Sequence, residues 1–203
     1  MKTLDSLGIA DNTMIILTSD NGPIIDDGYK DQAFELLGNH KPSAEMRGGK
    51  YSSFQAGTKV PFIVRWPLGA KKNTTSNAKI SQVDLLATLA QIVHAEIPKT
   101  GANDSQKLKN VLLGKSHNGR KYIIQQNVFN TLSIIKGNYK YTQPSNYAPY
   151  SDLTRTEYGS DKKPQLYNLK NDPQEKKNLA ETKKRKTEKL KKVIEKEKSK
   201  QEN

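Results

Sequence analysis

Runs of apolar residues define the secondary structure expected in the first half of the chain. Residues 14–17 and 60–66 are largely apolar, which is typical of strands buried on both faces of a parallel sheet. Residues 1–8 are expected to end a helix. Residues 81–93 predict an amphipathic helix, because apolar residues recur at helical spacing along one stripe: Val83, Leu86, Leu89, Ala90 and Val93. This order of elements predicts an α/β fold.

The second half of the chain follows a different pattern. Short apolar segments separated by polar turns predict strands over residues 122–128, 132–135, 139–142 and 165–169. Residues 136–138, with the sequence Lys-Gly-Asn, are expected to form a hairpin turn. The sequence therefore predicts a small antiparallel sheet in this half.

These patterns divide the chain into three predicted parts. Residues 1–115 are expected to belong to an α/β domain, residues 116–180 to a small antiparallel subdomain, and residues 181–203 to a basic terminal helix or tail. The first part has two predicted sheet strands, which are too few for a doubly wound sheet. We therefore expect the α/β part to be a piece of a larger sheet.

Composition narrows the classes of protein that agree with this pattern. The chain has 203 residues, of which 33% are apolar, so it can form one moderate domain with a small appendage. No stretch approaches the about 20 apolar residues of a membrane span, and the first residues lack the apolar core of a signal peptide. We therefore expect no membrane partner. The absence of cysteine excludes disulfides and a cysteine nucleophile.

A net charge of +13 suggests nucleic-acid binding, so the location of the charge matters. Residues 181–203 hold ten Lys and Arg against five Glu, and so contribute +5. The remaining excess is spread thinly, without the interleaved aromatic residues that stack on bases. A solvated, frayed terminal helix explains this segment better, and we expect no nucleic-acid partner.

A polar cluster follows the first predicted strand. The sequence Thr-Ser-Asp-Asn-Gly-Pro occupies residues 18–23, directly after the apolar run. Taken alone, it is more typical of a capped turn. In open α/β sheets, however, binding sites lie beyond the carboxyl ends of the strands. Asp20 and Asn21 offer hard oxygen donors that suit Ca²⁺ or Mg²⁺.

A second polar cluster, Arg-Gly-Gly-Lys at residues 47–50, follows a long polar loop. Its glycines allow backbone N–H groups to approach an anion closely. The Lys50 ammonium suits a tetrahedral oxyanion, and Arg47 offers a planar fork. Ordinary loop chemistry is an equal alternative for this cluster. His40 lies in the loop between the clusters and is a candidate for lining a substrate pocket, although a lone loop histidine is more often merely exposed.

The order of these motifs resembles the C-terminal half of the sulfatase family, within the alkaline-phosphatase-like superfamily. The segments that carry the resemblance are TSDNGP, RGGKYSSFQAGTKVPFIVRWP and QLYNLKNDPQEKKNLA, and it extends from about Leu4 to Leu179. It implies a partial α/β/α sheet of that superfamily and hydrolysis of sulfate esters, of which a sulfated carbohydrate is one candidate. By this resemblance, Asp20 and Asn21 are calcium ligands and Lys50 contacts the substrate sulfate.

The chain also departs from the family pattern. The family nucleophile is a formylglycine made from the Cys or Ser of a C/S-x-P/A-x-R motif upstream of Asp-Asn-Gly. The serine candidate Ser43 lies downstream and has glutamate at the third position of the motif, so we reject it. Gln55 stands where many members have glutamate, and the family's N-terminal aspartates are absent. We therefore expect a C-terminal portion with half of a calcium site, inactive without its missing N-terminal half.

Two other functions remain open. A phosphatase or phosphonate hydrolase of the same superfamily is an alternative, because a metal with a lysine would serve phosphate as well. A non-catalytic protein that binds anionic partners through its basic tail is a second alternative. Sulfatases are typically periplasmic, secreted or lysosomal, and the resemblance leaves the location of this chain open.

Overall fold

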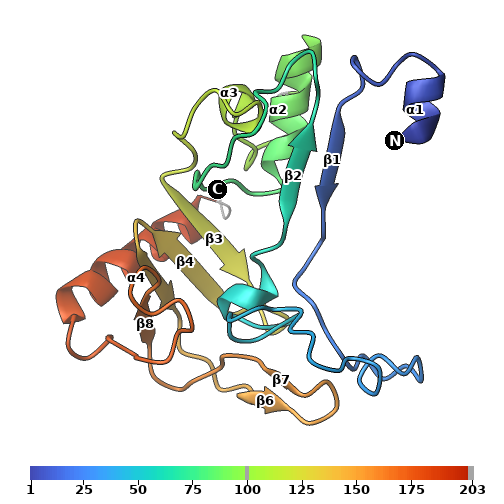
Figure 1. The fold of residues 1–203 in the computed structure, drawn as a ribbon. Helices are drawn as coiled ribbons and strands as arrows, with labels where there is room; N and C mark the ends of the chain where they lie inside the picture. Colours follow the sequence, from blue (N-terminus) through green and yellow to red (C-terminus); the bar gives the residue numbers. More distant parts are fainter. Residues whose placement is uncertain (99–100, 201–203) are drawn as a thin grey trace. The chain divides into compact units, whose positions relative to one another are not determined.

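The computed structural model describes residues 1–98 and 101–200 of the chain (Figure 1). Contacts divide the chain into two compact units. The first unit consists of Met1–Thr18 with Pro61–Ile123, and the second consists of Ser19–Val60 with Ile124–Asn203. The second unit thus joins the long polar loop to the C-terminal part of the chain. The domain boundaries expected at residues 115 and 180 stay a prediction.

The first unit contains a pair of strands where the sequence predicts them. Strand β1 (Ile15–Thr18) and strand β2 (Phe62–Arg65) pair with each other, with Ile16 opposite Val64. Their pairing is antiparallel, so the prediction of a parallel sheet buried on both faces is wrong for these strands. Leu17 is 60% exposed, because no further strand in the described residues extends this sheet and an antiparallel pair can leave a face in solvent.

Three helices complete the description of the first unit: α1 (Lys2–Ser6), α2 (Asp84–Val93) and α3 (Lys109–Leu112). The first two lie within the predicted helical segments. The apolar stripe predicted on α2 is not its buried face, since Val83 and Leu86 are more than half exposed. The buried face of α2 instead carries Asp84, Ala87 and Thr88. The prediction of the helix is confirmed, and that of its buried face is wrong.

Polar bonds explain why α2 buries that face. The Asp84 carboxylate accepts hydrogen bonds from the backbone N–H of Gln106 at 2.9 Å and from the Arg120 Nε at 2.8 Å. The Thr88 hydroxyl accepts from the backbone N–H of Leu108 at 3.0 Å. These side chains satisfy backbone donors of the connecting segment, which a leucine could not do. Burial raises the pKa of Asp84, but the bonds from Arg120 and from backbone N–H groups outweigh it and hold this pKa below its usual range.

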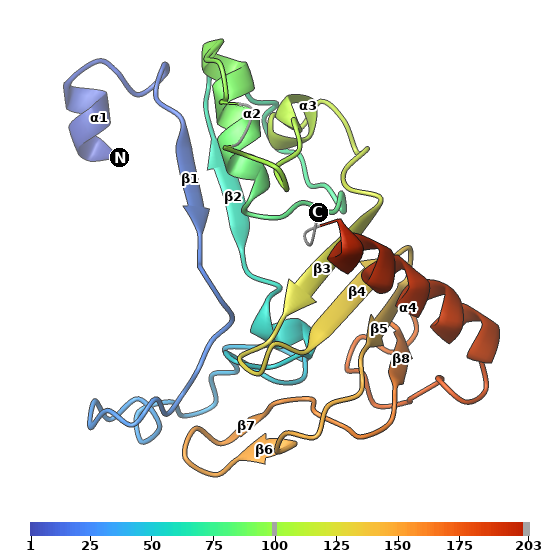
Figure 2. The ribbon, with the colours of Figure 1, turned by 180° about the vertical axis from the view of Figure 1, so that it is seen from behind.

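The second unit is built on a four-stranded sheet in the order β3-β4-β5-β8 (Figure 2). Strand β5 pairs antiparallel with both β4 and β8, as predicted, and the turn predicted between β4 and β5 is present. A short antiparallel hairpin of β6 and β7 lies between β5 and β8, where the sequence analysis predicts no strand. The strands are β3 (Tyr122–Gln126), β4 (Leu132–Lys136), β5 (Tyr139–Thr142), β6 (Tyr150–Ser151), β7 (Thr156–Glu157) and β8 (Gln165–Asn168).

Helix α4 (Lys184–Ser199) packs on β4 and β5 and covers one face of this sheet (Figures 1 and 2). Its Leu190 and Ile194 are 2% and 0% exposed. The terminal helix is therefore present, but the prediction that it is solvated and frayed is wrong, because two apolar residues four positions apart anchor it to the sheet. No helix in residues 1–98 and 101–200 is both long and apolar enough to cross a membrane.

The two faces of the four-stranded sheet carry different side chains, because successive strand residues point to opposite sides. On β5, Tyr139 and Tyr141 lie on the face covered by α4, where Tyr139 contacts Lys186 of that helix. Lys140 points to the other face, where it meets Glu175. The long loop from the first part of the chain packs on that other face, with the Phe54 ring 6.1 Å from the Tyr167 ring of β8.

Candidate active site

The Asp-Asn-Gly segment follows directly from the end of β1. The Ser19 hydroxyl donates a hydrogen bond to the Asn21 backbone carbonyl at 3.0 Å, and the Asn21 side-chain amide donates to the Gly22 carbonyl at 2.8 Å. Asp20 is exposed and Asn21 is partly buried. These local bonds form a defined turn that leaves the carboxylate of Asp20 in solvent.

Backbone hydrogen bonds bring the two polar clusters of the sequence together. The Gly22 N–H donates to the Gly57 carbonyl at 2.9 Å, and the Lys50 N–H donates to the Pro23 carbonyl at 2.8 Å. A Cβ atom at Gly22 would lie 1.5 Å from the Ala56 carbonyl oxygen, so a side chain cannot be accommodated there. Glycine is needed because the chain after β1 runs directly against the 3-10 turn η1 (Gln55–Gly57).

The Lys50 side chain ends beside the carboxylate of Asp27. Its Nζ lies 2.8 Å from Asp27 Oδ2, and the Tyr51 hydroxyl donates to Asp27 Oδ1 at 3.0 Å. The hydrogen bond to Asp27 raises the pKa of Lys50, and the same bond lowers the pKa of Asp27. The Lys50 side chain keeps 28% of its surface exposed. A charged ammonium is therefore held in place at a site that solvent reaches.

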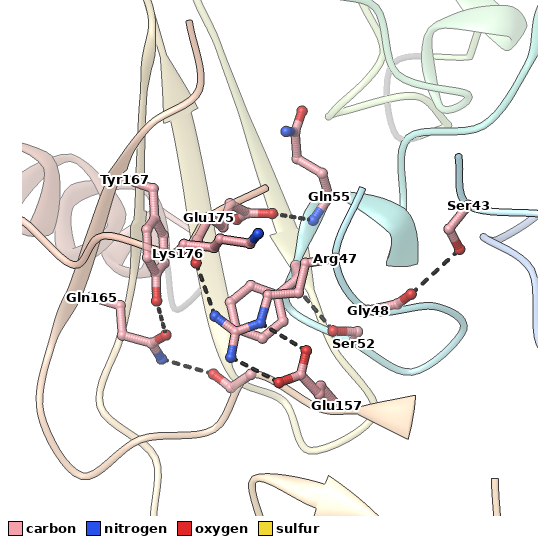
Figure 3. Close-up of polar contacts among 12 residues, drawn as sticks. Ser43, Arg47, Gly48, Ser52, Gln55, Glu157, Gln165, Tyr167, Glu175 and Lys176 are labelled. Atoms are coloured by element: carbon pink, nitrogen blue, oxygen red, sulfur yellow. Dashed lines mark hydrogen bonds and ion pairs between the residues drawn. The ribbon is translucent and has the colours of Figure 1, made fainter. Parts of the chain in front are cut away.

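Arg47 lies in a network of contacts with the C-terminal part of the chain (Figure 3). Its Nε and Nη2 donate to the two Glu157 carboxylate oxygens at 2.7 and 2.8 Å, and its Nη1 donates to the Glu175 carbonyl at 2.8 Å. The guanidinium also stacks 4.0 Å above the Phe54 ring. The bonds to Glu157 raise the pKa of Arg47, and they lower that of Glu157. The substrate-binding role of Arg47 stays a prediction, because these contacts already engage its planar fork.

A buried ion pair beneath this loop was not expected from the sequence. Lys140 Nζ lies 2.9 Å from Glu175 Oε1, and both side chains are 0% exposed. The other Glu175 oxygen accepts from the Gln55 backbone N–H at 2.6 Å (Figure 3). Burial lowers the pKa of Lys140, and Glu175 counteracts part of that shift. Glu175 thus ties strand β5 to the loop that carries Lys50.

The remaining predicted site residues are less engaged. His40 is exposed in a turn, where its backbone N–H donates to the Leu37 carbonyl at 3.1 Å, and its pocket role stays a prediction. Within the described residues, no group of three or more His, Asp or Glu side chains could hold a metal ion. The oxygens of Asp20 and Asn21 have the chemistry that a hard cation prefers, but they make up only part of a coordination sphere.

Comparisons with known proteins identify the family of the chain. A sulfatase model matches residues 1–95, and a model of the C-terminal part of N-sulphoglucosamine sulphohydrolase matches residues 49–202. An N-acetylgalactosamine-6-O-sulfatase of Bacteroides thetaiotaomicron is 53% identical over 180 residues, which are 89% of this chain and 35% of that protein. The chain thus spans about a third of the length of this relative.

Solved structures agree with this assignment. A structure from work on glycosaminoglycan metabolism by Bacteroides thetaiotaomicron superposes with a TM-score of 0.94 at 49% identity, covering 98% of this chain and 41% of that one. A Pseudoalteromonas sulfatase superposes with a TM-score of 0.74 at 20% identity, covering 98% and 39%, which shows the same fold. The predicted combination of an α/β part with a small antiparallel sheet and a helix is confirmed. The chain belongs to the sulfatase family, in the alkaline-phosphatase-like superfamily.

Proposed function

We propose that this chain is the part of a sulfatase that supplies a sulfate-binding lysine and two metal ligands to a site for a sulfated carbohydrate. The substrate class is a 6-O-sulfated N-acetylgalactosamine. The observation that carries this proposal is the 53% identity to the Bacteroides N-acetylgalactosamine-6-O-sulfatase over 89% of this chain. The backbone bonds that join the Asp-Asn-Gly turn to the loop of Lys50 support it.

Lys50 contributes charge at the site of the sulfate. Its ammonium is held protonated by Asp27 and keeps part of its surface open to solvent. A compact ammonium matches a tetrahedral oxyanion, and a cation already held at the site can stabilise the charge of the transition state. In this role, the Lys50 Nζ donates a hydrogen bond to a sulfate oxygen, either in addition to its bond with the Asp27 carboxylate or instead of it.

Asp20 and Asn21 would hold a calcium ion through their side-chain oxygens. When bound, such an ion offsets the negative charge of a sulfate ester. Calcium takes about six to eight oxygen ligands, and these two side chains supply a minority of them. The other ligands must come from the remainder of the enzyme, since no larger ligand group occurs among the residues that the structure describes.

The chain by itself is proposed to be inactive. It has no cysteine, and its serine candidate Ser43 does not stand in a motif that is converted to formylglycine. The Ser43 hydroxyl instead lies 3.4 Å from the Gly48 backbone carbonyl as a hydrogen-bond donor. A sulfatase site without its nucleophile and with part of its metal ligands should not turn over a sulfate ester.

The proposal is tested with the chain alone and with a completed enzyme. In the completed enzyme, this chain is joined to the part of the Bacteroides sulfatase that it does not match. We expect no turnover by the chain alone, and turnover of N-acetylgalactosamine 6-sulfate in preference to the 6-phosphate by the completed enzyme. Preference for the phosphate ester would instead support a phosphatase. Turnover by the chain alone that Lys50→Ala abolishes would contradict the proposed inactivity.

A further inference from the structure

An open groove of about 610 Å³ lies at the start of helix α4. Its walls are formed by residues 181–186 and Lys189 of the C-terminal segment and by Tyr139 of strand β5. Five of these residues are cations, namely residues 183–186 and Lys189, and all five are exposed. The groove therefore combines a concave shape with a concentrated positive charge. We call these five residues the groove cations.

The groove cations have no acidic ion-pair partner in the part of the chain that the structure describes. None of them forms an ion pair with an acidic side chain in residues 1–98 and 101–200. The acid that lines the groove, Glu181, lies 3.6 Å from the Lys163 ammonium. Further along α4, by contrast, Lys191 lies 3.7 Å from Glu195 one turn later. The groove cations thus have no acidic partner among the described residues, whereas Lys191, further along the same helix, has one.

This distribution of charge is unfavourable for the isolated helix. The first turn of α4 has no acidic residue and begins with Lys184, Arg185 and Lys186. Cations near a helix N-terminus oppose the helix dipole, and like charges on adjacent turns repel. A local arrangement that weakens the helix, without a compensating ion pair among the described residues, indicates a contact with an external anion. The charge sign indicates a polyanion.

The chemistry of the groove favours a sulfated polysaccharide over a nucleic acid. Protein grooves that bind single-stranded nucleic acids combine cations with aromatic rings on which the bases stack. The aromatic residue of this groove, Tyr139, has the Lys186 Nζ 4.9 Å from its ring centroid, so one face of the ring already has a cation against it. From Lys183 to Lys189 the cations extend over about 9 Å along the helix axis, enough to contact successive sulfate groups of one chain.

We propose that this groove is a second binding site, which holds a sulfated polysaccharide chain away from the Lys50 site. The choice of polymer rests on the proposed function, whose substrate class is a sulfated carbohydrate. The groove lies on the α4 side of the four-stranded sheet, because Tyr139 faces that helix. Lys140, on the opposite side, contacts Glu175 beneath the loop of Lys50. A second contact on one polymer raises the effective concentration of its sulfate esters near the enzyme.

The groove is tested by measuring how the 203-residue chain binds chondroitin 6-sulfate. The affinity is determined by calorimetry at about 50 mM and about 200 mM salt. One variant changes all five groove cations to Gln, which keeps a high helix propensity. A matched variant changes five exposed lysines of the first unit to Gln: Lys2, Lys71, Lys72, Lys107 and Lys115. Both variants lose the same charge. We expect the groove variant to bind about tenfold or more weakly with a flatter salt dependence, and the matched variant to bind within about twofold of the parent chain.

Several results would overturn the proposal. These are equal losses in the two variants, no binding by the parent chain, or undiminished binding of the desulfated polymer. Tighter binding of single-stranded DNA through the same cations would assign the groove to nucleic acid. Circular dichroism checks that α4 is retained, and the pair Arg185→Gln and Lys189→Gln should give an intermediate loss. Because the readout is binding rather than turnover, failure of Lys50→Ala to affect hydrolysis would refute the proposed function and leave this result standing.

Discussion

Replacing Glu175 by glutamine should uncover how much the buried ion pair contributes to the second unit. Glutamine retains an oxygen that can accept from the Gln55 N–H, which Glu175 now does at 2.6 Å. It removes the charge that faces Lys140, whose side chain is 0% exposed. The variant thus leaves the Lys140 ammonium without its counter-ion in the protein interior, with an uncharged amide NH₂ group beside it.

The expected cost follows from the burial of both groups. Breaking a fully buried pair by removing one partner costs about 3–5 kcal/mol, because the remaining charge is uncompensated. Lys140→Met should fall toward the lower end of that range, since the Glu175 carboxylate keeps its bond from the Gln55 backbone. The double variant removes both charges and should unfold with a free energy within about 1 kcal/mol of that of the parent chain, because replacing both partners of a buried pair is often close to neutral. The two substitutions should therefore be strongly coupled.

Urea unfolding of the four proteins at neutral pH measures these free energies, and amide hydrogen exchange in β4, β5 and β8 locates the change. Lys191→Met is a matched control, because the Lys191–Glu195 pair is about half exposed and should contribute less than about 1 kcal/mol. Single variants that each cost less than about 1 kcal/mol would refute the argument. Additive costs in the double variant would refute it as well, since they would show that the two charges do not interact.

Three further predictions concern the turn at Gly22, the loss of stability at acid pH and the binding of calcium. Gly22→Ala should lower the melting temperature strongly because its Cβ would overlap a backbone carbonyl, whereas Gly28→Ala, with open space at φ +82, should cost only about 1–2 kcal/mol of backbone strain. The lowered pKa of Asp84 stabilises the fold above the ordinary carboxyl pKa, and this contribution is lost as pH falls through the lowered value. The free energy of unfolding of Asp84→Asn should therefore change less between about pH 5 and pH 2 than that of the parent chain. An equal change with pH in the two proteins would contradict this. Calorimetry should show weak Ca²⁺ binding to this chain, lost in Asp20→Ala with Asn21→Ala, and tight stoichiometric binding would show that the site is complete.

Local patterns predicted the elements of the second unit well. Tyr139–Thr142 and its preceding turn lie as expected, because a hairpin is encoded by adjacent residues. The sequence also predicts the terminal helix. Its many charged residues, however, suggest a solvated helix and give little sign that Leu190 and Ile194 are buried. Two apolar positions among many lysines are a weak signal, although their spacing of four could have revealed the buried face.

Contacts between residues far apart in the sequence could not be predicted from local patterns. Arg47 and Glu157 are 110 positions apart, and their pairing depends on how the loop meets the β6–β7 hairpin. The Lys140–Glu175 pair gives no local sign of burial, since an alternating strand with a lysine normally exposes it. On α2, Asp84 takes the buried face because backbone N–H groups of a distant segment need acceptors. Motif resemblance identified the family, which no composition or periodicity could do.

The most direct test of the central claim is the effect of Lys50→Ala on hydrolysis of N-acetylgalactosamine 6-sulfate by the completed enzyme. We expect kcat/KM to fall by about 100- to 1,000-fold, the scale for losing one oxyanion donor. Lys50→Arg should not restore full activity, because a planar fork replaces a compact ammonium. Lys59→Ala, at an exposed lysine of the same loop, should leave kcat/KM unchanged. Activity of Lys50→Ala close to that of the parent enzyme would contradict the role assigned to Lys50.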